Sequence, residues 1–505
     1  MSILQNLEGH PTTTSDDTSG KVRNLAVAGL LVAATWAGIA AWWMPRGPMT
    51  TSQAIWSIAI SLIVGAVAGV LLRSRWAIVL TPAVFAVVFE VLRIGLDGPM
   101  VDGIHASMYG IIALVTGRGF HAVLALLPLA FGSAVGMGLV AGPTSRWSSL
   151  IMRTGVAIAA LAVLVVSVGL LRPATTAPIV GPDGRQLTGS VAELTGVDIG
   201  THQAKLMIRG HSTDNPVLLF LAGGPGGSEY GAMRRHLAEL ERHFTVVTWD
   251  QRGAGTAYSE LDPTGTVSPE GAVSDTIAVT EYLRDRFGQQ TIYLLGQSWG
   301  STLGVLAVQQ RPDLYAAFIG TGQMVSQSAT DRIFYRDTLA WAQRTGNDEL
   351  ASELLASGPP PYEDMLRYEA ALSHEQDVYP YDHSANSEGS GQMSENLLVE
   401  EYALIDQIHV LGAFMDTFAA LYPQLQEIDF RRTATDFSVP VFFVQGAHEA
   451  DGRALPFNEW YPMIDAPIKD RVVLETSGHR PLWEQPDAFV DYMVNTVLGR
   501  TSTMG

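Results

Sequence analysis

Residues 291–311 read TIYLLGQSWGSTLGVLAVQQR, and this stretch decides the fold of the second half of the chain. A short apolar run, 291–296, leads into GQSWG (296–300), and a helical pattern follows over 301–311. A Gly-x-Ser-x-Gly sequence between a strand and a helix is typical of a turn too tight for side chains at its flanking positions. The bend exposes the serine hydroxyl above the sheet. We therefore predict that Ser298 is a nucleophile.

Other short apolar runs accompany this motif. Runs of five or six residues rich in Val, Ile, Phe and Tyr are typical of strands that are covered on both faces, as in parallel sheets. Helical stretches such as 272–287 separate several of these runs, and this alternation indicates an open α/β sheet. Between 323 and 437 the pattern is long, helical and acidic, which predicts a helical cap inserted between two late strands. The predicted strands are 217–222, 244–249, 291–296, 315–320, 440–445 and 471–475.

A nucleophilic serine needs a base and an acid that orients the base. His479 follows the last predicted strand, and we predict that it is the base. The preceding strand ends in QGAHEAD (445–451), which offers two carboxylates. Glu449 has the commoner spacing from the strand, and Asp451 is the alternative acid. The order serine, acid, histidine is that of α/β-hydrolase triads.

Acyl transfer also needs hydrogen-bond donors for the developing oxyanion. GGPGG (223–227) follows the strand 217–222, and its glycines allow backbone N–H groups to point inward. The predicted donors are the N–H of Trp299 and one from Gly223 or Gly224. A phosphate-binding loop is disfavoured, because no G-K-[ST] follows and the G-x-G-x-x-G spacing is not met.

Four motifs together carry a resemblance to a known family. LAGGPG (221–226), WDQRGAG (249–255), GQSWG (296–300) and SGH (477–479) resemble the proline-iminopeptidase-like α/β-hydrolases, peptidase family S33, over about 190–498. The resemblance implies an α/β-hydrolase fold with a mostly parallel eight-stranded sheet, a helical cap and a Ser–acid–His triad. It also implies hydrolysis of amide or ester bonds, often at a peptide N-terminus, without a metal or an organic cofactor.

The sequence departs from this family where Ala222 replaces the usual histidine before the glycine run. Within WDQRGAG, we interpret Asp250 and Arg252 as a buried ion pair that shapes the site. Family aminopeptidases hold the substrate ammonium with carboxylates of the cap. Spacing does not select among the candidates, which are Glu388, Glu395, Glu400, Glu401, Asp406 and Asp416.

Charge divides the chain of 505 residues into two parts. Residues 1–175 carry 10 basic and 6 acidic side chains, whereas the whole chain carries 31 and 50, a net charge of −19. This acidity excludes nucleic acid as an expected partner. Cysteine is absent, which excludes thiolate metal sites and cysteine nucleophiles. The sparsely charged part is also the apolar part, so we predict a membrane region followed by an acidic domain.

Five apolar runs approach the roughly 20 residues that a helix needs to cross a bilayer. The loop bias of Lys and Arg places the N-terminus inside, and five spans then place the C-terminal domain outside the cytoplasm. Residues 104–117 are too short to span comfortably; a crossing there would reverse that sidedness. The predicted organisation is a cytoplasmic tail 1–23, spans within 24–172 (24–44, 52–72, 76–95, 119–141 and 151–171), a linker 173–190, a hydrolase core 191–322, a cap 323–437 and the rest of the core 438–498.

Taken together, the sequence predicts a multi-pass membrane-anchored serine hydrolase. An aminopeptidase acting on small peptides or amino-acyl amides is expected first. An esterase or lipase acting on lipophilic esters is the second candidate, and a non-catalytic sensor or transporter is the third. The expected partners are a small-molecule or short-peptide substrate and membrane lipid. Gly65 and Gly69 form a small-x-x-x-small pair that is compatible with close helix packing or with a homo-oligomer.

Overall fold

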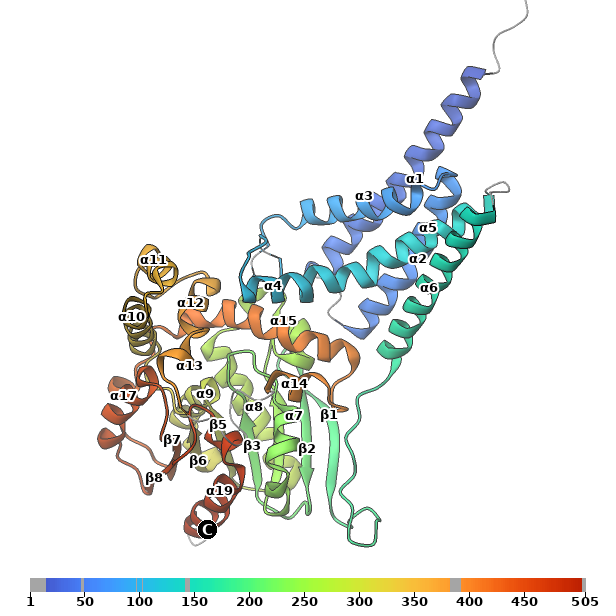
Figure 1. Cartoon of the computed structure of the whole chain (residues 1–505). Coiled ribbons are helices and arrows are strands. Elements are labelled where there is room, and N and C mark those ends of the chain that lie inside the picture. Colours follow the sequence, from blue (N-terminus) through green and yellow to red (C-terminus); the bar gives the residue numbers. More distant parts are fainter. Residues whose placement is uncertain are drawn as a thin grey trace, which may run out of the picture. The chain divides into compact units, whose positions relative to one another are not determined.

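The computed structural model describes residues 15–46, 50–96, 98–101, 103–140, 146–381 and 392–501 (Figure 1). Its chain divides into two compact units. The helical unit comprises Met1–Leu96 and Gly117–Arg172, and the α/β unit comprises Asp97–Thr116 and Pro173–Gly505. The first part of the predicted tail, 1–14, and the cap candidate Glu388 lie outside the described residues.

The N-terminal third consists of long apolar helices. Four helical stretches before residue 173 are long and apolar enough to cross a membrane: Lys21–Trp43, Thr51–Leu72, Met108–Val140 and Met152–Leu171; a fifth, Leu404–Leu425, lies in the α/β unit. The predicted span 76–95 corresponds to a shorter apolar helix. The helices are α1 (Ser15–Trp43), α2 (Thr51–Leu72), α3 (Ala77–Leu92), α4 (Met108–Leu114), α5 (Leu127–Val140) and α6 (Arg146–Leu171), and π-helical turns η1 (Val115–Gly119) and η2 (Ala122–Leu126) lie between α4 and α5.

Helices α2 and α5 pack backbone to backbone through glycines. A Cβ atom on Gly65 or Gly69 would lie 2.3 Å from a carbonyl oxygen of α5. A Cβ on Gly132 or Gly136 would likewise lie 2.3 or 2.0 Å from a carbonyl oxygen of α2. Such small-residue contacts are a common way for membrane helices to associate, because packing replaces the hydrophobic effect there. The Gly65–Gly69 pair therefore forms a helix contact within this chain.

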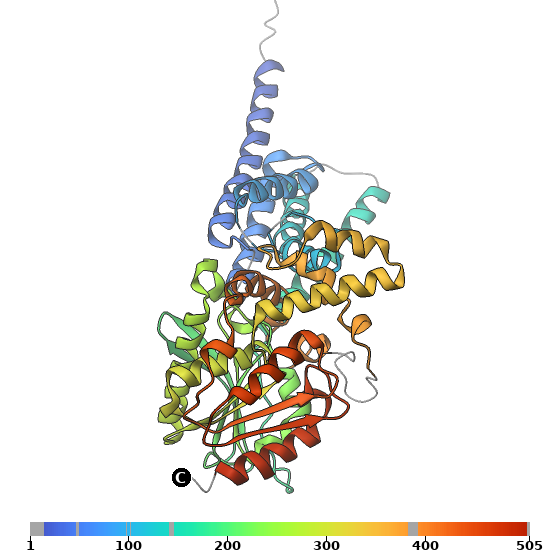
Figure 2. The ribbon, with the colours of Figure 1, turned by 90° about the vertical axis from the view of Figure 1, so that its left-hand side faces the viewer.

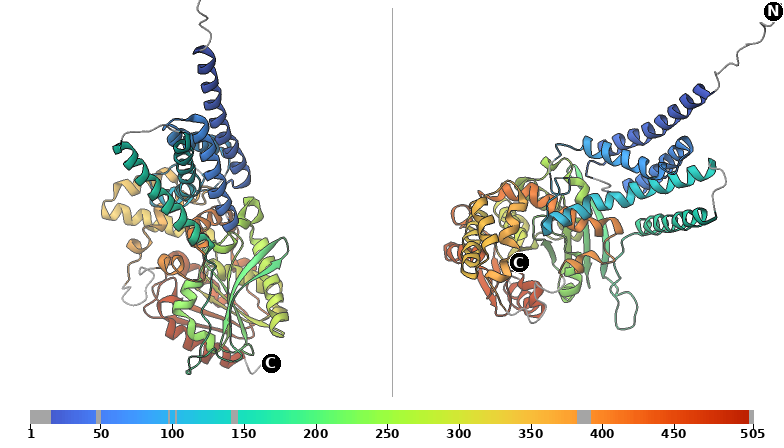
Figure 3. Two further views of the ribbon diagram at one scale, coloured as in Figure 1. Left: turned by 90° about the vertical axis from the view of Figure 1, so that its right-hand side faces the viewer. Right: turned by 45° about the horizontal axis from the view of Figure 1, so that its top comes forward.

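The α/β unit is built on one sheet of eight strands in the order β1-β2-β4-β3-β5-β6-β7-β8. β1 pairs antiparallel with β2, and β2 pairs antiparallel with β4, so the sheet begins with a hairpin at one edge (Figure 3). The remaining pairs are parallel. The strands are β1 (Val191–Ile199), β2 (His202–Gly210), β3 (Val217–Leu221), β4 (Thr245–Asp250), β5 (Ile292–Gln297), β6 (Tyr315–Thr321), β7 (Val441–Gly446) and β8 (Lys469–Leu474).

The central strands are apolar on both faces because helices cover both. In β3, Leu219 joins one hydrophobic cluster, whereas its neighbours Leu218 and Phe220 join another. This alternation follows from the two-residue period of a strand. The predicted mostly parallel α/β sheet is confirmed. β7, β8 and the C-terminal helices lie together at one edge of the sheet (Figure 2). The helices beside the sheet include α7 (Tyr230–His236), α8 (Pro269–Phe287), α9 (Trp299–Gln310), α17 (Asp451–Trp460), α18 (Pro481–Glu484) and α19 (Pro486–Asp491).

A long helical insertion separates β6 from β7. It corresponds to the cap predicted between two late strands, and among its described residues no strand occurs. Its helices are α10 (Gln327–Thr345), α11 (Asp348–Ser357), α12 (Glu369–Leu372), α13 (Glu375–Val378), α14 (Gln392–Leu397), α15 (Leu404–Leu421) and α16 (Phe430–Thr433).

Residues 97–116 belong to the α/β unit although they lie between apolar helices in the sequence. Met100 donates its N–H to Oδ1 of Asp416 in α15 at 3.2 Å. Both Met100 and Ala113 are members of the larger hydrophobic cluster of this unit. Figure 1 shows α4 beside α15. The stretch 104–117 forms no separate span: from Met108 it is the start of the helix that continues to Val140.

Candidate active site

Ser298 lies in a strained turn between β5 and α9. Its backbone has φ 53° and ψ −120°, a left-handed region that side chains rarely adopt. The flanking glycines are needed for close contacts, since a Cβ on Gly296 would lie 2.2 Å from the carbonyl oxygen of Gly300. A Cβ on Gly300 would in turn lie 2.0 Å from the carbonyl oxygen of Leu221 in β3. The neighbouring strands thus hold the turn in place.

The structure brings Ser298, His479 and Glu449 together. Nε2 of His479 lies 2.9 Å from Oγ of Ser298, and Nδ1 of the same ring lies 2.8 Å from Oε2 of Glu449. The three residues follow the carboxyl ends of β5, β8 and β7, which are at the same edge of the parallel part of the sheet. The spacing is that of a nucleophile, a base and an acid that orients the base.

The structure separates the two acid candidates. The side chain of Glu449 is 4% exposed and faces His479. Asp451 is exposed at the first position of α17, and no contact to His479 is among the hydrogen bonds of the described residues. His448, beside the acid, stacks on Tyr381 with ring centroids 5.1 Å apart.

Arg453 holds the second oxygen of Glu449. Its Nε donates to Oε1 of Glu449 at 2.7 Å, and its Nη groups pair with the carboxylate of Glu375 in α13 of the cap. Burial by itself would raise the pKa of Glu449, but the attraction of Arg453 and His479 outweighs it and lowers this pKa to about 2. The sequence analysis missed Arg453 and Glu375. Arg453 could have been predicted, because it lies four residues after Glu449, a spacing at which opposite charges often pair.

The glycine run after β3 lies against the nucleophile turn. A Cβ on Gly223 would lie 2.3 Å from Oε1 of Gln297 and 3.3 Å from Cβ of Ser298. Gly224 has φ 118°, which suits glycine alone. Trp299, the other predicted donor, begins α9, so its N–H is among the first-turn amides that have no acceptor within the helix. The predicted oxyanion donors are therefore adjacent to Ser298.

Gln251 connects this loop to the nucleophile turn. Its Nε2 donates to the carbonyl oxygen of Ala222 at 3.1 Å, and its Oε1 accepts from Nε1 of Trp299 at 2.9 Å. The side chain is buried. It therefore fixes the separation of the two segments that supply the predicted oxyanion donors.

The predicted ion pair between Asp250 and Arg252 is wrong. Arg252 pairs with Asp275 of α8 through two hydrogen bonds of 3.0 and 3.1 Å. Asp250 instead accepts from Thr256 at 2.9 and 3.0 Å and from the hydroxyl of Tyr402 at 3.0 Å. Burial raises the pKa of Asp250 to about 6, because no cation is among the groups that offset the loss of water. β4 ends at Asp250 and the chain turns after it, where Ala254 donates its N–H to the carbonyl oxygen of Gln251. The two-residue period of a strand therefore does not place Asp250 and Arg252 on one face.

A pocket of about 470 Å³ lies beside His479, which lines it, whereas Ser298 and the predicted oxyanion residues are not among its lining. It contains carboxylates other than those predicted, namely Glu375 and the exposed Asp377. None of the five described cap candidates lines it. Glu395 contacts His236 and Glu401 contacts Arg234, while Asp416 accepts from Tyr258. The lining consists of Met108, Tyr109, Leu372, Ser373, Glu375, Gln376, Asp377, Tyr379, Tyr381, His448, Ala450 and His479.

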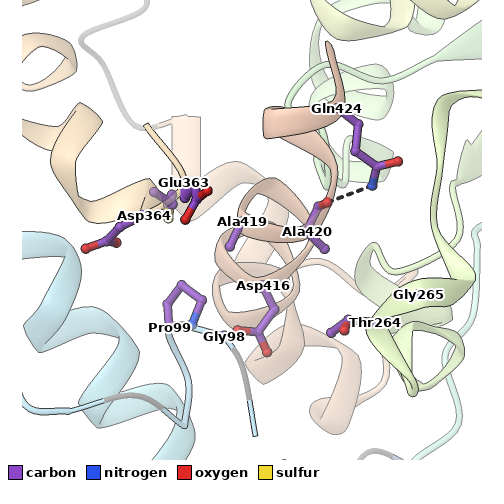
Figure 4. A pocket seen from close by; sticks show the side chains of 11 residues that line it. Gly98, Pro99, Thr264, Gly265, Glu363, Asp364, Asp416, Ala419, Ala420 and Gln424 are labelled. Carbon is purple, nitrogen blue, oxygen red and sulfur yellow. Dashed lines mark hydrogen bonds between the residues drawn. The ribbon is translucent and has the colours of Figure 1, made fainter. Parts of the chain in front are cut away.

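A second cavity of about 560 Å³ lies along α15, and none of the three triad candidates lines it. Figure 4 shows Asp416 on one side of α15, near Pro99, and Gln424 in the short helical turn η8 (Tyr422–Leu425) that follows α15. Among the described residues, no group of three or more His, Asp or Glu side chains is arranged to hold a metal ion.

Comparisons with known proteins agree with this architecture. Residues 216–486 match the family described as the alpha/beta hydrolase fold. A probable aminopeptidase of Bacillus subtilis is 30% identical over 305 residues, which cover 60% of this chain and 95% of the relative. A proline iminopeptidase of Lactobacillus delbrueckii subsp. bulgaricus is 28% identical over 182 residues, 36% of this chain and 59% of the relative.

Among solved structures, a proline iminopeptidase-related protein of Thermus thermophilus matches 60% of this chain and 95% of its own. The TM-score is 0.44 and the sequence identity 22%. The family match covers more than half of the chain, and the Bacillus subtilis relative is matched over nearly its whole length. The chain belongs to the α/β-hydrolase fold family, in its aminopeptidase- and proline iminopeptidase-like branch.

Proposed function

We propose that this protein is a membrane-anchored serine aminopeptidase. The single observation that carries the proposal is the hydrogen-bonded series from Ser298 through His479 to Glu449. It lies beside a glycine loop and opens on a pocket that His479 lines. A binding protein has no need of a nucleophile, a base and a buried acid in this order.

The proposed mechanism follows from these positions. Nε2 of His479 accepts the proton of the Ser298 hydroxyl as Oγ attacks the acyl carbonyl carbon. The N–H groups of Trp299 and of Gly223 or Gly224 stabilise the resulting oxyanion. Glu449 stays ionised, orients the imidazole and stabilises its protonated form. His479 then protonates the leaving amine. In the second half of the reaction, His479 accepts a proton from water as the water attacks the acyl carbon, and it returns the proton to Oγ of Ser298 as the acyl group leaves.

Two observations favour an aminopeptidase over other hydrolases. The two relatives reported above are named as a probable aminopeptidase and a proline iminopeptidase. The pocket beside His479 also contains Glu375 and Asp377. Glu375 is already paired with Arg453, so we assign recognition of the substrate ammonium to Asp377. A carboxylate attracts an ammonium group more strongly than it attracts a neutral N-acylated terminus.

The membrane anchor is the second element of the proposal. Two candidate spans, Met108–Val140 and Met152–Leu171, separate residue 107 from residue 173. An even number of crossings returns the chain to the same side, so both sequence parts of the α/β unit share one side of the membrane. This arrangement is compatible with the hydrogen bond between Met100 and Asp416. The loop charges favour the extracytoplasmic side.

The test uses purified full-length protein in detergent with a panel of amino-acyl p-nitroanilides, the same compounds N-acetylated, and p-nitrophenyl esters. We expect turnover of one or more free-amine anilides, loss of that turnover on acetylation, and covalent labelling of Ser298 by a fluorophosphonate. Ser298→Ala removes both labelling and turnover. Turnover that persists in Ser298→Ala defeats the proposal. Turnover of esters alone identifies an esterase instead.

A further inference from the structure

One wall of the pocket beside His479 comes from the start of α4. Met108 and Tyr109, in the first turn of α4, line the same 470 Å³ pocket as His479. They are separated from His479 by about 370 positions in the sequence. The rest of the lining comes from the cap and from the loop that carries the acid. The pocket is therefore completed by a part of the chain outside the family match, 216–486.

This wall is fixed to the cap. Oε1 of Glu369 accepts the N–H of Met108 at 2.9 Å and that of Tyr109 at 3.2 Å. The hydroxyl of Ser107 accepts the N–H of Gly110, which caps the same helix end. One turn further on, Ala113 is buried in the hydrophobic cluster of the α/β unit. The first turn of α4 is thus held by two side chains and by packing.

The two sides of the pocket differ in chemistry. Glu375, Gln376 and Asp377 form a polar, acidic side, whereas Met108 presents an apolar side chain. The apolar surface continues beyond the pocket. Within the α/β unit, the side chains of Met108, Ile111 and Val115 are 55%, 56% and 60% exposed. Met108 and Ile111 lie on α4 and Val115 begins η1, which continues the same helix; steps of three and four residues place the three side chains on one face of it.

We infer that this face of α4 binds the apolar chain of the substrate beyond the scissile bond, so that the substrate is an amphiphile with a free amine at one end. The inference rests on the proposed aminopeptidase function. An aminopeptidase keeps one residue on the acyl side, and the remainder of the substrate therefore lies on the leaving-group side. The acidic side of the pocket receives the ammonium group, and Met108 begins the path of the apolar chain.

Continuity of the surface identifies the occupant as a molecule that partitions into the membrane. At one end, the face of Met108, Ile111 and Val115 meets the pocket of His479. At the other end, the same helix continues to Val140 in a stretch apolar and long enough to cross a bilayer. A polar peptide is not stabilised by contact with such a surface. An apolar chain that enters from the bilayer stays in contact with apolar groups along it and is not exposed to water.

The experiment compares two substrates that share one acyl group. The amino acid preferred in the anilide panel is prepared as its N-methylamide and its N-dodecylamide, and release of the free amino acid is measured for full-length protein in one detergent. The readout is the ratio of kcat/KM for the dodecylamide to kcat/KM for the methylamide. The variants are Met108→Glu, the milder Met108→Gln, and the control Leu355→Glu, which is 59% exposed on α11 and does not line the pocket.

We expect a ratio above 1 in the unchanged protein, a ratio about tenfold lower in Met108→Glu, and an intermediate ratio in Met108→Gln, since a few methylene contacts discriminate by factors of this order. Leu355→Glu keeps the original ratio. Fluorophosphonate labelling of Ser298 in every preparation reports a folded site. Ratios that are equal in all four proteins overturn the inference and leave the aminopeptidase proposal intact. Absence of labelling and of methylamide turnover in the unchanged protein overturns both.

Discussion

Arg453 binds Glu449 on the side opposite to the histidine: its Nε donates to Oε1 at 2.7 Å, while Oε2 accepts from His479. The same guanidinium pairs with Glu375 of the cap. One buried cation thus connects the cap to the acid of the proposed triad. Its removal leaves two carboxylates without their counter-ion, and a broken buried pair costs about 3–5 kcal/mol.

The first prediction concerns Arg453→Met, which keeps the volume and removes the charge. The attraction of Arg453 no longer offsets the effect of burial, so the pKa of Glu449 rises from about 2 although His479 still lowers it. A carboxyl whose folded pKa lies below its ordinary 4.5 stabilises the protein above about pH 4.5, and this stabilisation disappears as the pH falls toward 2. Ionised Glu449 also stabilises the protonated imidazole, so protonation of Glu449 lowers activity. In the variant this protonation occurs at higher pH, and the decrease of kcat/KM on the acid side moves to higher pH. A pH profile from 4 to 8 measures the displacement.

A double variant separates this effect from simple damage to the fold. Glu375→Gln combined with Arg453→Met removes one of the two uncompensated carboxylates and recovers part of the lost melting temperature. It does not recover the original pH profile, because Glu449 still lacks its cation. Identical pH profiles in the original protein and in both variants would show that Arg453 has no influence on the acid.

The second prediction compares the two acid candidates. Glu449→Gln removes the charge that stabilises the protonated imidazole and lowers kcat by about 10³–10⁴-fold, as in other triads. Asp451→Asn leaves kcat within about twofold, since surface substitutions away from a site have small effects. Steady-state kinetics on one anilide measures both. A large loss in Asp451→Asn with normal activity in Glu449→Gln would reverse the assignment.

The third prediction concerns the glycine loop. A methyl group at Gly223 meets Oε1 of Gln297 at 2.3 Å, so Gly223→Ala displaces the loop from the nucleophile turn. Loss of one oxyanion donor lowers kcat by about 10²–10³-fold, with little change in KM. Gly265→Ala is the matched control, because a Cβ there meets nothing within 4 Å. An unchanged kcat in Gly223→Ala would exclude this loop from the site.

The fourth prediction tests the glycine contact of α2 and α5. Gly136→Ala places a methyl group 2.0 Å from the carbonyl oxygen of Ala66 and destabilises the helical unit by about 1–3 kcal/mol. Gly138→Ala on the same helix meets nothing within 4 Å and serves as the control. Thermal unfolding in detergent compares the two. Equal melting temperatures would argue against the close contact.

The fifth prediction concerns sidedness and exploits the absence of cysteine. Leu398→Cys, 82% exposed in the α/β unit, reacts in intact cells with a membrane-impermeant maleimide. Ser74→Cys, in the loop between α2 and α3, reacts only after lysis. The loop charges favour one arrangement by a modest margin, and either variant alone tests it. The opposite pattern of labelling would place the hydrolase in the cytoplasm.

Much of the site could be predicted because its residues follow strands. The sequence analysis identified Ser298, His479 and two possible acids from their positions after β5, β8 and β7. It could not choose between Glu449 and Asp451 with certainty, since the choice depends on where α17 begins. It missed β1 and β2 as apolar runs because β1 and the first half of β2 contain exposed or partly exposed residues.

Other contacts could not be predicted because they join distant segments. Arg252 has Asp250 two residues away, yet it pairs with Asp275, 23 residues further along in α8. The sequence contains no signal for that choice. The role of 97–116 was equally hidden, because an apolar stretch suits lipid and a protein interior alike. Only the contacts of Met100 and Ala113 distinguish the two.

Because α4 is part of the α/β unit, this unit cannot be separated from the N-terminal region by a simple truncation or by recombination. A fragment that starts at Pro173 would lack Met100, Ala113 and the first turn of α4, and would expose the buried face of α15 that they cover. The N-terminal apolar region, which includes α4, is thus not an interchangeable attachment for the α/β unit. Recombination that joins this hydrolase to a different anchor would also remove a wall of its pocket, so the two parts are expected to evolve as one gene.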